Sequence, residues 1–211
     1  MSDEFKRRTP SRRGEGGALR QEILVAAARL LMRSGREGDL SLRAVAREVG
    51  IAAPSIYLHF RDRAELMEAL TQQLYHRLTE CLREAREEGA VDGPRAALRA
   101  MAQAYCGFAF DHPKHYRLMF AIERIEVARP EASPHPLWEV SQAWTEAVAA
   151  CRNDPAGGPR DEAAPSDARV ARLVWSSLHG MVALAMAMPF PADRAAIAEM
   201  ADELLGLALA E

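Results

Sequence analysis

Polar and cationic side chains gather between residues 41 and 63, in a chain whose remaining pattern is apolar and helical. Hydroxyl, imidazole and guanidinium groups donate hydrogen bonds to phosphate oxygens, and small apolar side chains contact thymine methyl groups in the major groove. This stretch therefore predicts binding to double-stranded DNA. The polar, cationic and apolar side chains of this stretch include Ser41, Arg43, Ala52, Ala53, Pro54, Ser55, Tyr57, Leu58, His59 and Arg63.

Two short helices are expected to position these side chains. Ser41 is a good N-cap, and the apolar residues from Leu42 to Val49 recur at helical spacing. Gly50 follows where a left-handed residue ends a helix at the least cost. A second helix is expected to start around Pro54, because the first helical turn tolerates proline. Two short helices joined at a glycine form the helix-turn-helix pattern, in which the second helix reads the groove.

Residues 50–66 carry a recognisable motif, Gly-Ile-Ala-Ala-Pro-Ser-Ile-Tyr-Leu-His-Phe followed by Arg-Asp-Arg-Ala-Glu-Leu. It resembles the DNA-binding region of the TetR/AcrR transcriptional regulators, and the resemblance is specific over about residues 18–66. The resemblance implies that Ser41 and Arg43 reach phosphates and the groove edge. It also implies a reading surface, with Ser55 as a phosphate or base contact, that is formed by Ala52, Ala53, Pro54, Ser55 and Leu58. It further implies that Tyr57, His59 and Arg63 bind phosphates. Arg63 stands where the family usually carries Lys, and an arginine can fill the same role.

Two questions about this surface stay open at the level of sequence. Tyr57 and His59 have an alternative role as caps over the small core that Phe60 enters. The reading surface is also poor in hydrogen-bonding side chains. Base specificity is therefore expected from Arg43, from a basic N-terminal arm, or from DNA shape.

Charge is divided unevenly along the 211-residue chain, whose formal net charge is −3. Residues 1–66 hold 13 Lys and Arg against 9 Asp and Glu, a net of +4, and the remainder holds 14 against 21, a net of −7. A basic N-terminal part on an acidic body is the pattern expected of local contact with DNA. The length suits one or two small domains.

Several classes of function are disfavoured by composition. Three widely spaced cysteines predict a reducing cytoplasm and thiols packed as small apolar groups. His112, His115 and His135 lie beside prolines in expected turns, so no metal site is expected. The first residues lack an apolar run, so no secretory signal is expected. The chain has no Gly-rich phosphate loop, paired His/Glu motif or nucleophile elbow, so neither an enzyme nor a cofactor is expected.

The apolar periodicity predicts an all-α fold of about nine helices. Residues 1–17 are expected to form a disordered basic arm that contacts the minor groove or stays solvated. A three-helix helix-turn-helix DNA-binding domain is expected over 18–64, beginning with a helix over 18–34, and a larger helical effector-binding and dimerisation domain over 65–211. Beyond the helix-turn-helix, the expected helices are 62–87, 94–110, 113–121, 135–152, 167–188 and 192–210, with a flexible loop over 153–166.

The run from Val174 to Gly180, Val-Trp-Ser-Ser-Leu-His-Gly, is similar to the Trp-His-Gly motif that names one C-terminal subgroup of the same family. Trp175 and His179 are four residues apart and share a helix face. They either line an effector cavity or belong to an ordinary core. A largely apolar cavity with a few polar groups suits a small hydrophobic effector. The candidate effector-binding residues are Tyr105, Phe108, His115, Met119, Trp138, Trp144, Trp175 and His179.

The last two expected helices are too apolar to face solvent. Paired with the same helices of a second copy they would form a four-helix interface, and the family resemblance also implies a homodimer. The candidate interface residues are Leu173, Leu178, Met181, Val182, Ile197, Met200 and Leu204. Residues 173–190 approach the length of a membrane span, but polar residues interrupt them, so no membrane partner is expected.

Together these features predict a ligand-responsive homodimeric repressor that releases a palindromic operator when a small hydrophobic effector binds the C-terminal domain. A dimer suits such an operator, because its two reading heads match half-sites about 34–36 Å apart. A regulator switched by a protein partner, one switched by cysteine oxidation, and a helical enzyme are the alternatives.

Overall fold

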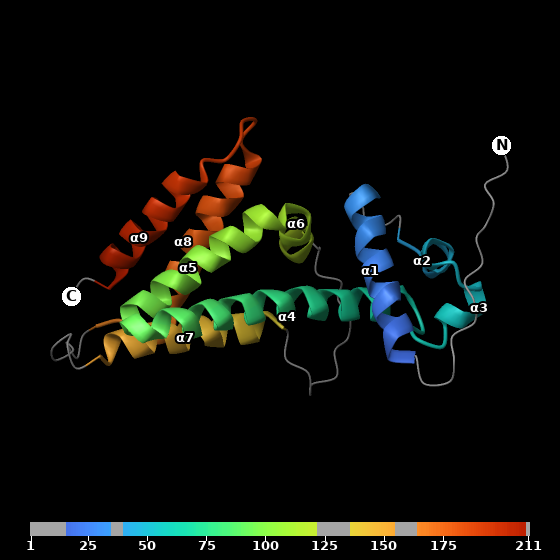
Figure 1. Ribbon diagram of the computed structural model, residues 1–211, viewed down its shortest axis with the longest axis horizontal. Coiled ribbons are helices and arrows are strands. Elements are labelled where there is room, and N and C mark those ends of the chain that lie inside the picture. Colours follow the sequence, from blue (N-terminus) through green and yellow to red (C-terminus); the bar gives the residue numbers. More distant parts are fainter. Residues whose placement is uncertain (1–15, 35–39, 122–135, 155–163, 210–211) are drawn as a thin grey trace. The chain divides into compact units, whose positions relative to one another are not determined.

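The computed structural model describes residues 16–34, 40–121, 136–154 and 164–209, and every regular element in these ranges is helical (Figure 1). The predicted all-α class is thus confirmed for this part of the chain. The predicted basic arm falls almost wholly on residues 1–15, outside the described ranges, as does most of the predicted loop over 153–166. The α-helices are α1 (Gly16–Ser34), α2 (Leu42–Val49), α3 (Ala53–Ile56), α4 (Arg63–Gly89), α5 (Pro94–Asp111), α6 (Pro113–Ala121), α7 (Leu137–Arg152), α8 (Asp167–Ala187) and α9 (Arg194–Ala208).

The chain divides into two compact units. The N-terminal unit is Met1–Leu74 with Arg117–Arg129, and the second unit, called the body below, is Tyr75–Tyr116 with Pro130–Glu211. The division falls inside α4, which therefore contributes residues to both units. Each unit has its own apolar core.

The helix-turn-helix of the N-terminal unit has the local geometry that its sequence predicts. The Ser41 hydroxyl accepts a hydrogen bond from the Ala44 N–H at 3.2 Å and so caps α2. Gly50 ends α2 in the left-handed region, with φ of 79°. Its N–H bonds to the Ala46 and Arg47 carbonyls, which closes the last turn.

Apolar side chains from α1 to α4 form the core of the N-terminal unit. The helices α2 and α3 are too short to be stable alone, so this shared burial holds them in place. An ion pair adds to it on the surface, where Arg33 Nη2 lies 2.7 Å from Glu48 Oε2 and joins α1 to α2. The most deeply buried residues are Ile23, Leu24, Val45, Ile56, Phe60, Leu66 and Leu70.

The long helix α4 begins and ends at well-defined positions. Asp62 caps its first turn by accepting the Glu65 N–H at 2.8 Å. Its last residue, Gly89, lies against the backbone of α5, because a Cβ there would meet the Ala96 carbonyl oxygen and the Ala97 Cα at 2.9 Å. Only glycine allows this close approach. A short 3-10 helix, Ala90–Asp92, then leads into α5.

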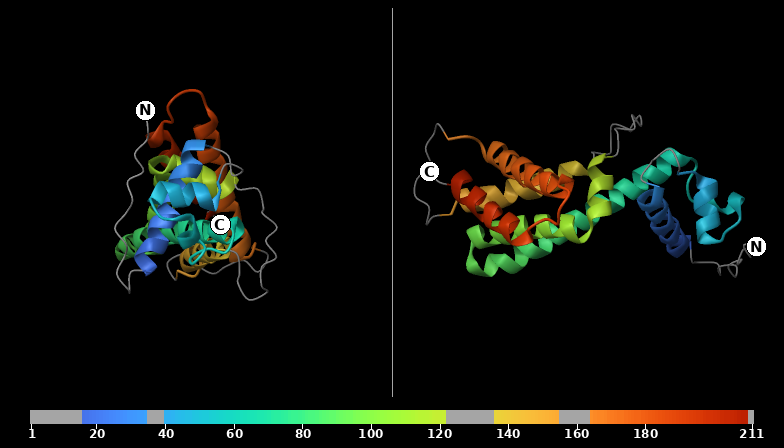
Figure 2. Two further views of the ribbon diagram at one scale, coloured as in Figure 1. Left: turned by 90° about the vertical axis from the view of Figure 1, so that its right-hand side faces the viewer. Right: turned by 90° about the horizontal axis from the view of Figure 1, so that it is seen from above.

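The body packs α5, α7, α8 and α9 around a second apolar core. α8 and α9 run side by side in two views (Figures 1 and 2), and α7 lies along α8. Arg99 of α5 pairs with Asp202 of α9, and Arg152 pairs with Asp167 at 2.8 Å between α7 and α8. Fully buried residues of this core are Leu98, Met101, Tyr105, Val140, Trp144, Val174, Leu178 and Val182.

Helix boundaries differ from the predicted ones by a few residues. α1 begins at Gly16 rather than at residue 18, and α4 continues through Gly89 rather than ending at residue 87. α9 is shorter than predicted, because Asp193 caps it by accepting the Ala196 N–H at 3.1 Å. A side-chain cap of this kind sets where a helix starts more sharply than apolar spacing does.

Candidate DNA-binding surface and polar cluster of the body

The residues predicted to contact DNA lie on the surface formed by the start of α2, α3 and the turn after α3. Leu58 is 85% exposed and Tyr57 is 49% exposed, so neither has a core position. Ser55, His59 and Arg63 are half-buried. The exposed remainder of the set is Ser41, Arg43, Ala52, Ala53 and Pro54.

The turn after α3 determines which side chains face outward. Four residues, Ala53–Ile56, form the helix, and the Phe60 N–H then bonds to the Ile56 carbonyl at 3.0 Å. Ile56 and Phe60 are both fully buried. Tyr57 and Leu58 lie between these two anchors on the solvent side. This arrangement leaves the Tyr57 hydroxyl accessible to a phosphate and leaves Leu58 accessible to the floor of a groove.

The N-terminus of α2 is a second feature suited to phosphate. Its first N–H groups lack intrahelical partners, and the helix dipole places partial positive charge there. The Ser41 side-chain oxygen caps one of them, and Arg43 lies exposed in the first turn of the helix. Backbone N–H groups and a guanidinium at one helix start are a common phosphate-binding arrangement.

Arg20 of α1 also lies at this surface, and the sequence reasoning missed it. Its guanidinium carbon is 4.8 Å from the centre of the Phe60 ring, next to the turn that carries His59. A cation over an aromatic face gains electrostatic stabilisation and holds the arginine in place. No sequence pattern signals this contact, since the two residues are forty positions apart and belong to different helices.

Two carboxylates of the N-terminal unit are committed to internal ion pairs. The hydrogen bond from Arg33 lowers the pKa of Glu48 below its usual range. The Arg61 backbone N–H and guanidinium lower the pKa of Glu65 in the same way, and Arg61 Nε lies 2.9 Å from Glu65 Oε2. These pairs partly neutralise negative charge that would otherwise repel a phosphate backbone.

In the body, three of the bulky residues form a hydrogen-bonded triad. The Tyr105 and Tyr116 hydroxyls are 2.8 Å apart, and His179 Nδ1 lies 2.6 Å from the Tyr116 hydroxyl. Tyr105 and Tyr116 are buried, and His179 is half-buried. The sequence reasoning placed Tyr105 and His179 together but missed Tyr116, which lies 63 positions from His179.

Burial keeps the triad uncharged near neutral pH. It raises the pKa of both Tyr105 and Tyr116 and lowers the pKa of His179 below 6.5. A neutral imidazole accepts at only one nitrogen. In one neutral tautomer the Tyr116 hydroxyl donates to Nδ1, and in the other Nδ1–H donates to the Tyr116 oxygen.

Two tryptophans flank this triad. Trp144 is fully buried, and its ring meets the Tyr105 ring edge-on with 5.9 Å between centres. Burial raises the pKa of Tyr105, and side-chain hydrogen bonds with Tyr116 and with Trp175 of α8 counteract part of this rise. Together Tyr105, Tyr116, Trp144, Trp175 and His179 are called the polar cluster below.

The other residues predicted to bind an effector lie elsewhere. His115 is half-buried, and the desolvation of its ring lowers its pKa. The His112 ring meets the Phe108 ring edge-on and the His115 ring at a tilt, with ring centres 5.2 and 5.8 Å away. Trp138 is 56% exposed, and Met119 belongs to the N-terminal unit by contact.

The residues predicted to form a dimer interface divide into three groups by exposure. Leu178, Val182 and Ile197 are buried inside the body itself, so they are not available on its surface. Leu173 and Met200 are 58% and 46% exposed. The half-buried members are Met181 and Leu204.

In the described ranges the cysteines are unreactive thiols, and the potential metal ligands do not form a metal site. Burial raises the pKa of Cys106 and of Cys151 to about 11, so both thiols stay protonated near neutral pH. Cys81 is half-buried, and its pKa is raised as well. No three His, Cys, Asp or Glu residues of the described ranges lie close enough together to hold a metal ion.

This chain combines a helix-turn-helix with a larger helical body, which is an architecture typical of DNA-binding transcriptional regulators. The model described as "Bacterial regulatory proteins, tetR family" matches residues 23–70, and the model described as "Tetracyclin repressor-like, C-terminal domain" matches residues 98–206. The chain belongs to the TetR family of regulators, which are not enzymes. Membership of the Trp-His-Gly subgroup stays a prediction.

Solved structures agree with this assignment. A protein with unknown function from Rhodococcus sp. RHA1 is 30% identical over 95% of this chain and 100% of its own, with a TM-score of 0.71. A regulatory protein designated SCO4313 is 28% identical over 94% and 100%, with a TM-score of 0.69. The fold is shared by the multidrug binding protein EbrR complexed with imidazole, at 22% identity over 93% and 96% and a TM-score of 0.60.

Proposed function

We propose that this regulator is a homodimeric repressor that releases a palindromic operator when a small, largely apolar effector binds the body. The observation that carries the proposal is the division of chemistry between the units. The N-terminal unit exposes side chains that are suited to binding phosphates and contacting base edges, and the body holds a polar cluster inside an apolar core. The side chains that bind the phosphates of the operator are Ser55, Tyr57, His59 and Arg63, together with Arg43 at the start of α2.

An exposed apolar stripe on α8 supports the dimer. Leu173, Ser177, Gly180 and Leu184 are spaced by four, three and four residues, so they lie on one helix face. Leu173 and Leu184 are 58% and 64% exposed, and a Cβ at Gly180 would meet nothing within 4 Å. Small residues between two leucines let a second helix approach closely.

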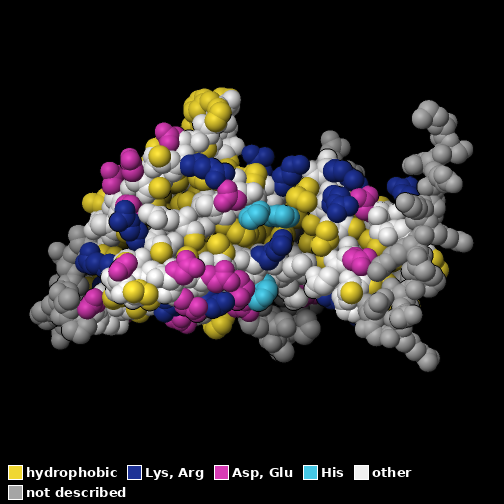
Figure 3. Space-filling model, viewed as in Figure 1, with side chains coloured by type: hydrophobic (Ala, Val, Ile, Leu, Met, Phe, Trp, Pro, Cys, Tyr) yellow, Lys and Arg dark blue, Asp and Glu magenta, His cyan; other side chains and the backbone are white. Residues whose placement is uncertain are grey.

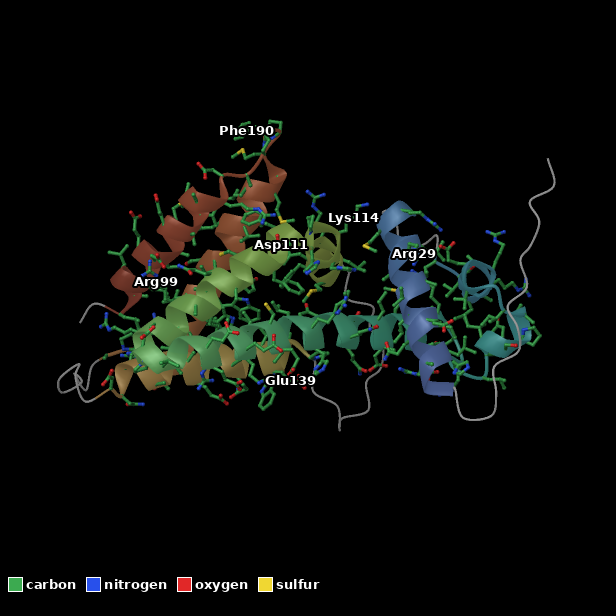
Figure 4. The ribbon with its side chains drawn as sticks, viewed as in Figure 1. Arg29, Arg99, Asp111, Lys114, Glu139 and Phe190 are labelled. Atoms are coloured by element: carbon green, nitrogen blue, oxygen red, sulfur yellow. The ribbon has the colours of Figure 1, made fainter. Side chains whose placement is uncertain are left out.

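α9 continues this apolar face. Met200 is 46% exposed, and Leu207 is 78% exposed. Hydrophobic side chains also project at the turn between α8 and α9, where Phe190 lies 63% exposed (Figures 3 and 4). Exposed apolar area of this extent on two adjacent helices is typical of a subunit interface.

The same α8 is long and apolar enough to cross a membrane by length and composition, with 28% of its apolar window buried inside the protomer. A subunit interface accounts for this composition equally well, because burial against a partner helix needs the same apolar surface. Membership of a DNA-binding family favours the interface, and we propose that the protein works in the cytoplasm, where its operator is accessible.

The switch requires a difference in affinity between two states. An effector that binds the operator-free state a hundredfold more tightly shifts the equilibrium by about 2.7 kcal/mol. Because α4 belongs to both units, a change in its tilt within the body moves the reading helices. Small molecules bind related folds, as imidazole does in the EbrR complex.

Two alternatives to a small effector could operate the switch. One is a protein partner, and the other is cysteine oxidation. The raised pKa of Cys106 and Cys151 disfavours oxidation, since the reactive species is the thiolate. A protein partner would need a surface on the body that the dimer leaves free. Effector binding uses the polar cluster and is therefore preferred.

The proposal is tested by selecting DNA from a random double-stranded pool with the full-length protein. The expected product is an inverted repeat whose half-sites lie about one helical turn apart, or a multiple of it. The salt dependence of binding to that product is then measured. Arg43→Ala removes two phosphate contacts per dimer and should reduce the slope of log K against log salt by about 1.8.

Arg169→Ala provides the matched control. Arg169 is exposed on α8, outside the reading surface, and its replacement changes the net charge of the protein by the same amount as Arg43→Ala. An unchanged slope in Arg43→Ala would overturn the assigned contact. Recovery of DNA without any repeated half-site would overturn the dimeric repressor.

A further inference from the structure

One arginine of the N-terminal unit contacts an aromatic ring. Arg20 of α1 is half-buried, and its guanidinium carbon lies 4.8 Å from the centre of the Phe60 ring. Phe60 is fully buried, so Arg20 helps to shield the ring from solvent. The electrostatic attraction between a cation and an aromatic face holds the guanidinium at this place. A permanent positive charge is thereby fixed at the surface of the unit.

Three carboxylates around the helix-turn-helix are committed to other groups. Glu48 and Glu65 form ion pairs with other arginines, with N–O distances of 2.7 and 2.9 Å. Asp62 accepts the Glu65 N–H at the start of α4. These carboxylates are therefore occupied, and none of the three neutralises the positive charge of Arg20.

Arg20 lies next to the turn that carries candidate phosphate-binding residues. His59 directly precedes Phe60, and Tyr57 is 49% exposed. The Phe60 N–H bonds to the Ile56 carbonyl at 3.0 Å, so the ring and these two side chains belong to one closed turn. A side chain anchored on the Phe60 ring is consequently anchored to the same turn. Arg20 thus brings a cation from α1 to the edge of the proposed DNA surface.

A guanidinium group is suited to binding a ring and a phosphate at the same time. It is planar and carries five N–H donors, and an aromatic ring attracts its charge without occupying these donors as a carbonyl oxygen would. Two of the N–H groups can point to two oxygens of one phosphate, which gives a bidentate pair. A lysine ammonium lacks this planar shape. The contact with Phe60 therefore prepares Arg20 for a phosphate in a way that charge alone does not.

We propose that Arg20 is a further DNA-binding residue, whose guanidinium, held over the Phe60 ring, donates hydrogen bonds to a backbone phosphate beside those bound by Tyr57 and His59. The contact adds affinity without reading sequence, because a phosphate carries no base information. It also couples α1 to the reading turn, since one guanidinium touches both the ring and the DNA. This inference rests on the proposed function, because it adds a residue to the proposed DNA surface.

The first experiment measures how salt affects binding of the full-length protein to a duplex of about 30 base pairs with random sequence, by fluorescence anisotropy. Arg20→Gln should reduce the slope of log K against log salt by about 0.9 per contact, or about 1.8 for a dimer. A role of Arg20 in packing alone would weaken binding without changing this slope. An unchanged slope in Arg20→Gln would overturn the inference.

Arg29→Gln is the matched control on the same helix. Arg29 lies nine residues after Arg20, which is about 2.5 helical turns, so the two side chains lie on opposite sides of α1. Both variants lose one positive charge, and the Arg29 side chain is 57% exposed. The slope of Arg29→Gln should equal that of the natural protein. An equal reduction in both variants would assign the effect to net charge and would overturn the contact.

Arg20→Lys tests the role of the Phe60 ring. It keeps the positive charge, so the slope should stay close to that of the natural protein. The affinity should nevertheless fall about threefold to tenfold, because the ammonium group binds one phosphate oxygen at a time and fits the ring less well. Natural affinity in Arg20→Lys would contradict the proposed hold of the ring on a guanidinium.

The contacted phosphate is then located on the selected operator by replacing single phosphates with neutral methylphosphonates. Each half-site should contain one position where the replacement weakens binding of the natural protein and of Arg29→Gln but not of Arg20→Gln. If the operator is recovered and no such position exists, Arg20 is not a phosphate contact and the proposed function stands. If the random duplex shows the expected slope change and selection yields no inverted repeat, the Arg20 contact stands and the dimeric repressor fails.

Discussion

Leu184→Glu offers the sharpest test of the proposed dimer. Leu184 lies on the exposed stripe of α8 and is 64% exposed in the protomer. Fully burying a leucine contributes about 1.5–3 kcal/mol, so the two-thirds that a partner would cover contributes roughly 1–2 kcal/mol. In a two-fold symmetric interface the residue counts twice, which gives roughly 2–4 kcal/mol for the pair.

This free energy sets the expected effect on association. At about 1.4 kcal/mol per tenfold, Leu184→Ala should raise the dimer dissociation constant by at least roughly 30-fold. Leu184→Glu should raise it further, because each carboxylate would be buried without a partner. Sedimentation velocity across a concentration series measures both variants. It should show Leu184→Glu as a monomer where the natural protein is a dimer.

Val91→Glu is the matched control. Val91 is 88% exposed, lies between α4 and α5 away from the stripe, and receives the same change of charge and side chain. Circular dichroism should show unchanged helicity in both glutamate variants, because neither position is in the core. If Leu184→Glu stays dimeric alongside Val91→Glu, the interface does not include this face of α8.

Three further predictions concern stability and pH. Ser41→Ala and Asp62→Ala should each lower the free energy of unfolding by about 1 kcal/mol in denaturant titration, whereas Ser166→Ala, at a helix start without a side-chain cap bond, should have little effect. Gly89→Ala should destabilise by about 1–3 kcal/mol, because its Cβ would meet the backbone of α5, whereas Gly107→Ala has open space and should be neutral or stabilising. Burial lowers the pKa of His179 below 6.5, so the unfolded chain binds this proton first and the free energy of unfolding should fall as pH drops below about 6.5. His179→Gln should show a shallower fall in melting temperature over that window, and identical pH profiles would contradict the assigned burial.

The local features of the fold were predictable because neighbouring residues determine them. Ser41, Gly50 and Asp62 act on backbone groups within four positions, so a cap or a left-handed glycine is visible in the sequence. Helix type followed from apolar spacing in the same way. Such signals place elements along the chain but carry no information on which elements meet.

Contacts between distant segments were not predictable for that reason. Tyr116 and His179 come from different helices, and nothing at either position indicates the other. α8 is apolar on most sides, so periodicity alone did not separate Leu178, which is fully buried, from Leu184, which is largely exposed. Likewise, Trp138 and Trp144 are six residues apart on α7, yet one is exposed and the other is buried.

The tight contact at Gly89 fixes the C-terminal end of α4 against the backbone of α5. The 27 residues of α4 extend about 39 Å from Arg63 to Gly89, at about 1.5 Å per residue. If a tilt of α4 pivots at this contact, the Arg63 end of the helix moves the furthest. A tilt of about 5° would move the Arg63 end by about 3.4 Å over that length. That displacement is comparable to the rise of one DNA base pair, about 3.4 Å. In the proposed homodimer, a displacement of this size in each protomer would be enough to misalign its reading helix with a half-site.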